Sequence, residues 1–149
     1  MKSLFNQADN AEMIQRINKL TPGSSPQWGK MQVSHMMAHC NVALQSAFGD
    51  VKLKRSILGK LVGPMAKKKL LGPKGFSRNL PTDKHFIIHD HRDFNEEKTK
   101  LTGLVQRFVE KGASALSSEP HPFFGNLTTE EWDALMWKHL DHHLAQFGE

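Results

Sequence analysis

Cysteine is almost absent from this chain of 149 residues, which contains only Cys40. A disulfide bond within the chain is therefore excluded. The sequence also lacks any apolar run that approaches the ~20 residues of a membrane-spanning helix. Its first residues contain no apolar core of a signal peptide. We accordingly expect a soluble, cytoplasmic protein that has no membrane partner.

Acidic residues are missing from one long segment. Residues 51–82 hold nine Lys or Arg and no Asp or Glu, although the net charge of the whole chain is only +5. Such a segment could bind nucleic acid, anionic lipid or an anionic cofactor, and Lys67 and Lys69 are the candidates for attracting a thiol cofactor. Phe76 is its only aromatic residue, which argues against nucleic-acid binding by base stacking. A solvated helix face is the simpler interpretation.

The remaining composition is that of a folded domain. Hydrophobic residues make up 38% of the chain and charged residues 23%. A chain of this length can bury a sizeable core without disulfides. We therefore predict a single domain over residues 1–149.

Hydrophobic residues recur at helical spacing, and turn signals divide them into five segments. The predicted helices span residues 8–20, 31–48, 56–71, 94–111 and 129–147. The third helix, which is basic and amphipathic, is predicted to be broken or kinked at Gly63–Pro64 and to cover the opening of the bundle. Residues 85–89 are predicted to form an extended loop. The predicted fold class is all-α, a four-helix bundle in which a long crossover between the second and fourth helices carries the extra short basic helix.

Several helix ends are marked by capping residues. Asp9 or Asn10 is predicted to cap the first helix, and Asp93 the helix over 94–111. Thr128 and Glu131 form the pattern of a capping box before the last helix. Gly112 fits the C-terminal end of the helix that precedes it.

Histidines supply the most specific chemical signal. His139 and His143 lie four residues apart in the last predicted helix, on the side that also carries Trp132 and Leu135. Two imidazoles one helical turn apart can bind one metal ion. Because buried imidazoles need polar partners, a metal ion would satisfy both at once. The alternative is a histidine-rich, solvated final turn, favoured by the helix dipole.

A third ligand can come from the second predicted helix, where His35 and His39 are also four residues apart. Spacing alone leaves the choice between them open. One histidine from this helix and the pair from the last helix would make a three-nitrogen site with an open position, which is the pattern of catalytic rather than structural metal sites.

Other side chains could support such a centre. His35, His121, Asp141 and Gln146 are candidates for hydrogen bonds to the ligands. His121, in a Pro-flanked loop, could line a pocket mouth or be a turn residue. Cys40 neighbours His39 but lies about 100° around the helix, so a small buried hydrophobic residue is a simpler interpretation than a thiolate ligand.

Two segments resemble a known group of proteins. In the first, Trp28 opens a helix and His39 follows eleven residues later. The second reads His139-x-x-x-His143-x-x-Gln146. Both resemble the DinB/YfiT-like superfamily of four-helix metalloenzymes. Residues 121–148 further resemble an uncharacterised bacterial branch of it, a domain of unknown function.

The resemblance implies a divalent metal ion bound by His39, His139 and His143, and it is the ground for choosing His39 over His35. It also implies a homodimer, and some members of the superfamily are transferases or isomerases that use low-molecular-weight thiols. One departure matters: relatives often read Arg-Gly-Gln after the last histidine, whereas this chain reads Leu-Ala-Gln. The substrate class therefore does not carry over.

We therefore expect a divalent-metal-binding protein with a three-His open site for zinc, nickel, iron or manganese. Its activity would be that of a metal-dependent thiol transferase or small hydrolase acting on a small molecule. A His-Glu-x-x-His motif is absent, so the zinc-protease arrangement is excluded. One alternative is a non-catalytic metal-binding or stress-response module, and a second is a basic nucleic-acid-associated protein, although nucleic acid is not the expected partner.

Overall fold

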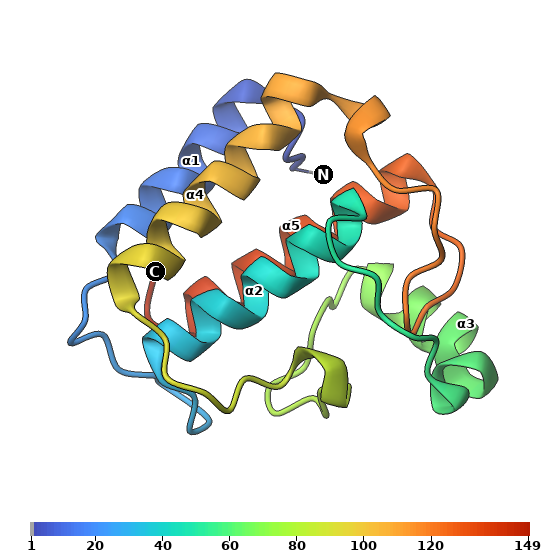
Figure 1. The fold of residues 1–149 in the computed structure, drawn as a ribbon, viewed down its shortest axis with the longest axis horizontal. Coiled ribbons are helices and arrows are strands. Elements are labelled where there is room, and N and C mark those ends of the chain that lie inside the picture. Colours follow the sequence, from blue (N-terminus) through green and yellow to red (C-terminus); the bar gives the residue numbers. More distant parts are fainter. Residues whose placement is uncertain (1) are drawn as a thin grey trace.

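A computed structural model describes residues 2–149, and within this range the regular secondary structure is entirely helical (Figure 1). The five α-helices are α1 (Gln7–Lys19), α2 (Val33–Phe48), α3 (Ile57–Leu71), α4 (Phe94–Lys111) and α5 (Thr129–Gln146). Two single-turn 3₁₀ helices, η1 (Lys84–Phe86) and η2 (Ala113–Ala115), lie in the connections. The predicted all-α fold class is confirmed.

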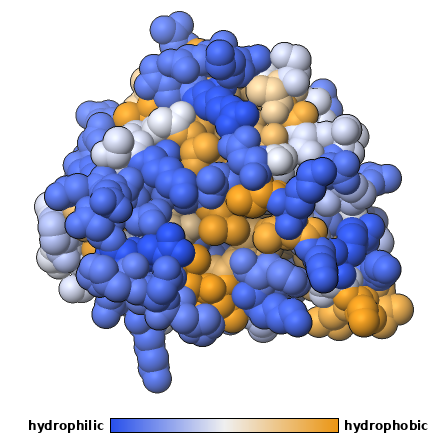
Figure 2. All heavy atoms as spheres, viewed as in Figure 1, coloured by the Kyte–Doolittle hydropathy of each residue, from blue (hydrophilic) through white to orange (hydrophobic). Residues whose placement is uncertain are grey.

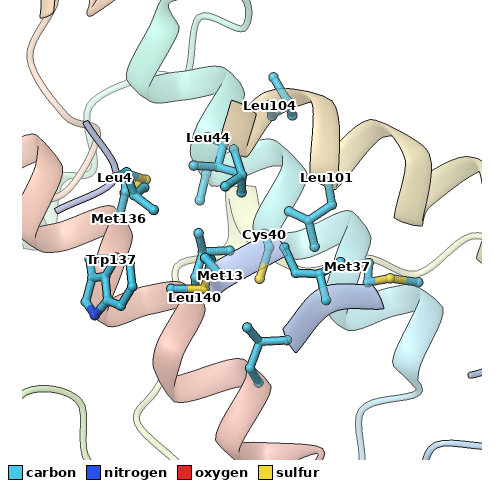
Figure 3. Close-up of a cluster of buried hydrophobic side chains, with 14 of the residues drawn as sticks. Leu4, Met13, Met37, Cys40, Leu44, Leu101, Leu104, Met136, Trp137 and Leu140 are labelled. Carbon is cyan, nitrogen blue, oxygen red and sulfur yellow. The ribbon is translucent and has the colours of Figure 1, made fainter. Parts of the chain in front are cut away.

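Four of the helices make the bundle. Helix α4 packs against α1 and α2, and α5 also packs against both of them. Side chains from all four meet in one apolar core, part of which is drawn in Figure 3. The largest fully buried side chains are Leu4, Met13, Ile17, Leu20, Met36, Met37, Leu44, Leu101, Phe108, Trp132, Leu140 and Leu144. This core holds α2 and α5 at the fixed spacing on which the site described below depends.

Helix ends follow the predicted capping chemistry with one exception. Asp93 caps α4 through the backbone N–H of Glu96, and Thr128 and Glu131 form a capping box at α5. The predicted caps of α1 were wrong, because the side chain of Asn6 accepts the N–H groups of Ala8 and Asp9. The helix starts early enough for Asn10 to lie inside it, where its side chain donates to two backbone carbonyls, one of them in α4.

Helix α3 is not broken at Gly63–Pro64. It runs as one helix with Pro64 in its interior. Proline removes one backbone N–H, which leaves the carbonyl four residues earlier, that of Lys60, without its helical donor. Lys60 and Pro64 are both exposed, so water can satisfy this carbonyl and the helix continues.

The expectation that α3 covers the bundle opening with its apolar side was wrong for four residues: Ile57, Leu58, Leu61 and Met65 are all exposed. The buried residues of α3 are Gly59, Gly63 and, near its end, Leu70. A Cβ atom at Gly59 or Gly63 would come within 2.6 Å or 2.2 Å of the carbonyl oxygen of Phe123. Helix and loop are thus in backbone contact, which only glycine permits.

Residues 85–89 are not wholly an extended loop. Lys84–Phe86 form the turn η1, capped by the side chain of Asp83, and the chain after it is irregular. Phe86 is buried and lies beside α2. Its backbone carbonyl becomes important at the site.

No helix among the described residues is long and apolar enough to cross a membrane.

The backbone contact of α3 can be tested with a matched pair of glycine substitutions. Gly63→Ala should loosen α3, because the new methyl group has no room against the Phe123 carbonyl. Tryptic cleavage within this lysine-rich helix should then accelerate by about tenfold. Gly103→Ala in α4 has nothing within 4 Å of the added Cβ, so it should leave cleavage unchanged and slightly raise stability. Equal cleavage of both variants would contradict the contact.

Candidate metal centre

Helices α2 and α5 bring three histidines together in the bundle. His39 comes from α2, and His139 and His143 come from successive turns of α5. One ring nitrogen from each lies within 4.8 Å of the other two, and the Nε2 atoms of His39 and His139 are 2.8 Å apart. The side chains are 5%, 9% and 8% exposed. Among residues 2–149 these three form the group that could hold a metal ion, and it includes no Cys, Asp or Glu.

The outer nitrogen of His39 is held by the backbone. Its Nδ1 lies 2.8 Å from the carbonyl oxygen of Phe86, in η1. A carbonyl oxygen only accepts, so Nδ1 carries the proton and donates. The neutral ring therefore presents a lone pair on Nε2, which faces the other two histidines.

His143 is held in the same way through a chain of two bonds. The amide nitrogen of Gln146 donates to the carbonyl oxygen of Trp28 at 2.9 Å. This orients Oε1 of Gln146 towards Nδ1 of His143, 2.9 Å away. Nδ1 must then donate, and the lone pair of His143 is again on Nε2. The predicted candidate Gln146 thus contacts a member of the triad.

Burial keeps all three rings neutral. Desolvation lowers the pKa of His39, lowers that of His139 well below its usual value, and lowers that of His143 to about 3. Unfavourable interactions with the neighbouring histidines add to the lowering of the pKa of His139 and His143. A metal ligand must be neutral imidazole, so the triad is ready to coordinate at neutral pH.

The donor set fits a divalent cation. In a tetrahedral site with metal–nitrogen bonds of ~2.0–2.1 Å, ligand atoms lie ~3.3 Å apart. The observed separations, 2.8 Å for one pair and up to 4.8 Å for the group, bracket this value. Three imidazole nitrogens and no carboxylate suit zinc, nickel, iron or manganese rather than calcium or magnesium.

Aromatic rings enclose the triad. The ring of Phe86 lies 6.2 Å from His39, and that of Phe76 lies 5.6 Å from His139. Phe76 also lies beside His142, which in turn contacts the rings of Trp28 and His143. A cavity of about 430 Å³ lies beyond Phe76 and His142, and the residues that line it include Trp28, Lys74, Phe76, Arg78, Lys138 and His142 but none of the three triad histidines. It is therefore partly aromatic and edged by cations.

His121 is buried beside this wall. Its Nδ1 accepts the N–H groups of Phe123 and Phe124, which places its proton on Nε2. Its ring stacks on Phe86 at 6.0 Å and lies 5.4 Å from Trp132. Burial lowers its pKa to about 3, an effect that Arg55 reinforces and Asp83 opposes. These contacts are those of a turn residue, and they also place His121 next to the residue whose carbonyl holds His39.

The other predicted candidates lie outside the triad. His35 bonds the carbonyl of Asp90, and Asp141 is exposed and pairs with Arg16 at 2.7 Å. Cys40 is fully buried with Sγ 3.8 Å from Sδ of Met36, and burial raises the pKa of its thiol.

The two lysine candidates are also elsewhere. Lys67 pairs with Glu131, and Lys69 is exposed on α3.

Sequence reasoning missed the groups that orient the ligands from outside the two helices. The carbonyls of Phe86, in η1, and of Trp28, in the connection before α2, lie outside the two helices, and a backbone carbonyl leaves no signature in the side-chain pattern. Phe76 was noted only as an isolated aromatic residue of the basic segment, although it lies against His139.

Neutral buried histidines should make the metal-free protein sensitive to mild acid. Below about pH 6.5 these histidines bind protons in the unfolded chain but remain neutral in the folded chain. The free energy of unfolding therefore falls as the pH decreases towards about 3. Each such histidine contributes a slope of about 1.4 kcal/mol per pH unit. Urea unfolding between about pH 6.5 and 5 should show a shallower slope for His121→Gln than for the parent. The exposed His89→Gln serves as the control, and an unchanged slope in His121→Gln would contradict the assignment.

Comparison with known proteins gives a family but no activity. No curated protein and no solved structure shows significant similarity to the chain. A family model, described as a protein of unknown function (DUF1569), matches residues 2–149. The match therefore includes all three histidines and every helix of the bundle. The chain belongs to this DUF1569 family.

Proposed function

We propose that the protein binds one divalent metal ion through the Nε2 atoms of His39, His139 and His143. The proposal rests on the hydrogen bonds of the triad, in which the inward-facing ring nitrogens offer more acceptors than donors. His39 and His143 both direct lone pairs inward, because their Nδ1 atoms donate to Phe86 and Gln146. In a neutral triad only Nε2 of His139 could donate, and it can donate to one partner. A cation satisfies all three nitrogens together, whereas an unsatisfied buried group costs ~1–3 kcal/mol.

The proposed centre is open. Three protein ligands leave a tetrahedral or larger coordination sphere incomplete, as in catalytic rather than structural sites. When bound, the metal would lower the pKa of a water molecule, polarise a carbonyl or activate a thiolate. The chain's own residues supply the surroundings: Phe86 and Phe76 lie against the triad on two sides, and the Nδ1 contacts hold His39 and His143 in one tautomer.

A small anionic substrate, such as a thiol in its thiolate form, fits these surroundings best. The cavity beyond Phe76 joins this aromatic ring and that of Trp28 to the cations of Lys74 and Arg78. Its only lining carboxylate, Asp141, is already paired with Arg16. A metal-dependent thiol transferase is therefore our first candidate, with a small hydrolase beside it. The resemblance to DinB/YfiT-like proteins supports the same candidate, because some of them are transferases that use low-molecular-weight thiols. Homodimers are common among them, so we also propose a homodimer.

The second candidate is a non-catalytic metal-binding module. It is favoured by the absence of any carboxylate from the triad group, since hydrolytic chemistry usually relies on a nearby general base.

The open coordination position separates the two candidates. In the cobalt-substituted protein, a small thiol should change the visible absorption if it coordinates the metal, and it should leave the spectrum unchanged if the metal is closed off.

Metal analysis of the untagged protein tests the site itself. We expect about one zinc, nickel, iron or manganese ion per chain, and sharply less in each of His39→Ala, His139→Ala and His143→Ala. His35→Ala, which removes the other histidine of α2, should retain the metal. Failure of the parent to bind any of these metals after reloading would overturn the proposal, and so would a normal metal content in all three triad variants.

The contact between Gln146 and His143 predicts a smaller and graded effect. Gln146→Ala should weaken metal binding by about 10- to 100-fold without abolishing it, because His143 loses the acceptor that fixes its tautomer. Gln106→Ala, at an exposed position of α4, is the matched control. Competition with a chelator gives the affinities, and an affinity of Gln146→Ala equal to that of the control would contradict the role.

A further inference from the structure

Helix α3 carries an apolar stripe on its outer face. Ile57, Leu58, Leu61 and Met65 are 79%, 60%, 77% and 74% exposed. With 3.6 residues per turn, these four positions fall within about 100° of the helix circumference. Figure 2 shows the corresponding hydrophobic cluster at the lower right, where Figure 1 places α3. Single exposed aliphatic residues are ordinary on protein surfaces, but four large ones on one helix face indicate an interaction surface.

The packing of α3 fixes this outward direction. Gly59 and Gly63 are buried against the backbone of Phe123. The backbone N–H of Ser56 donates to the carbonyl of Pro122, and Nζ of Lys138 donates to the carbonyls at the last turn of α3. Turning the stripe inward would require large side chains at the glycine contact, which has no room for a single Cβ atom. The glycine contact with Phe123 therefore keeps the apolar stripe on the exposed side of α3.

Basic residues border the stripe. Lys60 lies on one side of it, Lys69 on the other, and Lys68 within its span, and all three are exposed. None of them is in an ion pair among residues 2–149, where Lys67 with Glu131 is the only such pair on α3. The whole segment 51–82 contains no acidic residue. A binding partner of this surface must therefore present both apolar groups and negative charge.

A bilayer with anionic headgroups offers both, and we propose that α3 binds such a surface. Ile57, Leu58, Leu61 and Met65 would enter the boundary between headgroups and acyl chains, and the lysines would contact anionic headgroups, as in other interfacial amphipathic helices. Such a helix lies in the plane of the membrane and needs no spanning segment. Neither the sequence resemblance nor the family match assigns this role.

A second copy of the chain fits the surface less well. A symmetric contact through the stripe would bring Lys60, Lys68 and Lys69 close to their own counterparts, with no acidic residue in the segment to compensate. Four side chains also fall far short of the ~20–30 residues a side that stable interfaces use. Nucleic acid would use the charge but not the aliphatic stripe.

Co-sedimentation with lipid vesicles tests the proposal. The full chain should bind vesicles of phosphatidylcholine and phosphatidylserine, bind pure phosphatidylcholine vesicles much more weakly, and lose affinity as salt is raised. Leu61→Ser with Met65→Ser should reduce partitioning by about tenfold or more. Lys60→Glu with Lys68→Glu should reduce it by a similar factor. Both pairs are exposed, so circular dichroism and metal content should remain those of the parent.

The matched controls replace equivalent residues on α4. Val109→Ser removes an exposed aliphatic side chain, and Lys100→Glu reverses an exposed charge, and both should bind vesicles as the parent does. The proposal is overturned if the parent does not bind anionic vesicles, binds neutral ones equally, or binds undiminished in the α3 variants. It is also overturned if sedimentation velocity shows a dimer that Leu61→Ser with Met65→Ser dissociates, because a second copy would then cover the stripe.

Discussion

Burial of three imidazoles between α2 and α5 is the constraint on which the rest of the site depends. Desolvation lowers the pKa of each ring and keeps it neutral, and a neutral imidazole then needs one acceptor and one donor or cation. The loop carbonyl of Phe86 and the amide of Gln146 supply the acceptors for His39 and His143. The inward lone pairs of His39 and His143 remain, and a metal ion could satisfy them together.

The bundle and α3 are built by different kinds of packing. Large apolar side chains interlock between α1, α2, α4 and α5, which gives the rigid core that positions the triad. Helix α3 instead meets a loop through glycine, and four of its large apolar residues face outward. The first arrangement explains how three histidines are held in register, and the second explains why one helix is available for an outside partner.

The two proposals stand on separate parts of the molecule. The metal centre rests on the hydrogen bonds of three buried histidines, whereas the lipid surface rests on exposed residues of α3 that contact none of them. Membership of DUF1569 covers both regions and assigns an activity to neither. The turn at His121 is the structural link, because it packs against Phe86 on the metal side and its chain neighbour Phe123 contacts α3.

Helical periodicity and capping are local properties, so the all-α class, the helix positions to within about two residues and the pairing of His139 with His143 on one helix face could all be predicted from the amino-acid pattern. Spacing could not choose between His35 and His39, because residues four apart lie on the same face of a helix. The family resemblance was the ground for choosing His39, and the structure shows that His39 meets the pair while His35 bonds Asp90, because the turn of α2 that faces α5 depends on how the whole core packs. The structure also shows that Gly59 and Gly63 of α3 face inward and that four of its large apolar residues face outward, because a backbone contact with a distant loop leaves no periodic signal in the sequence.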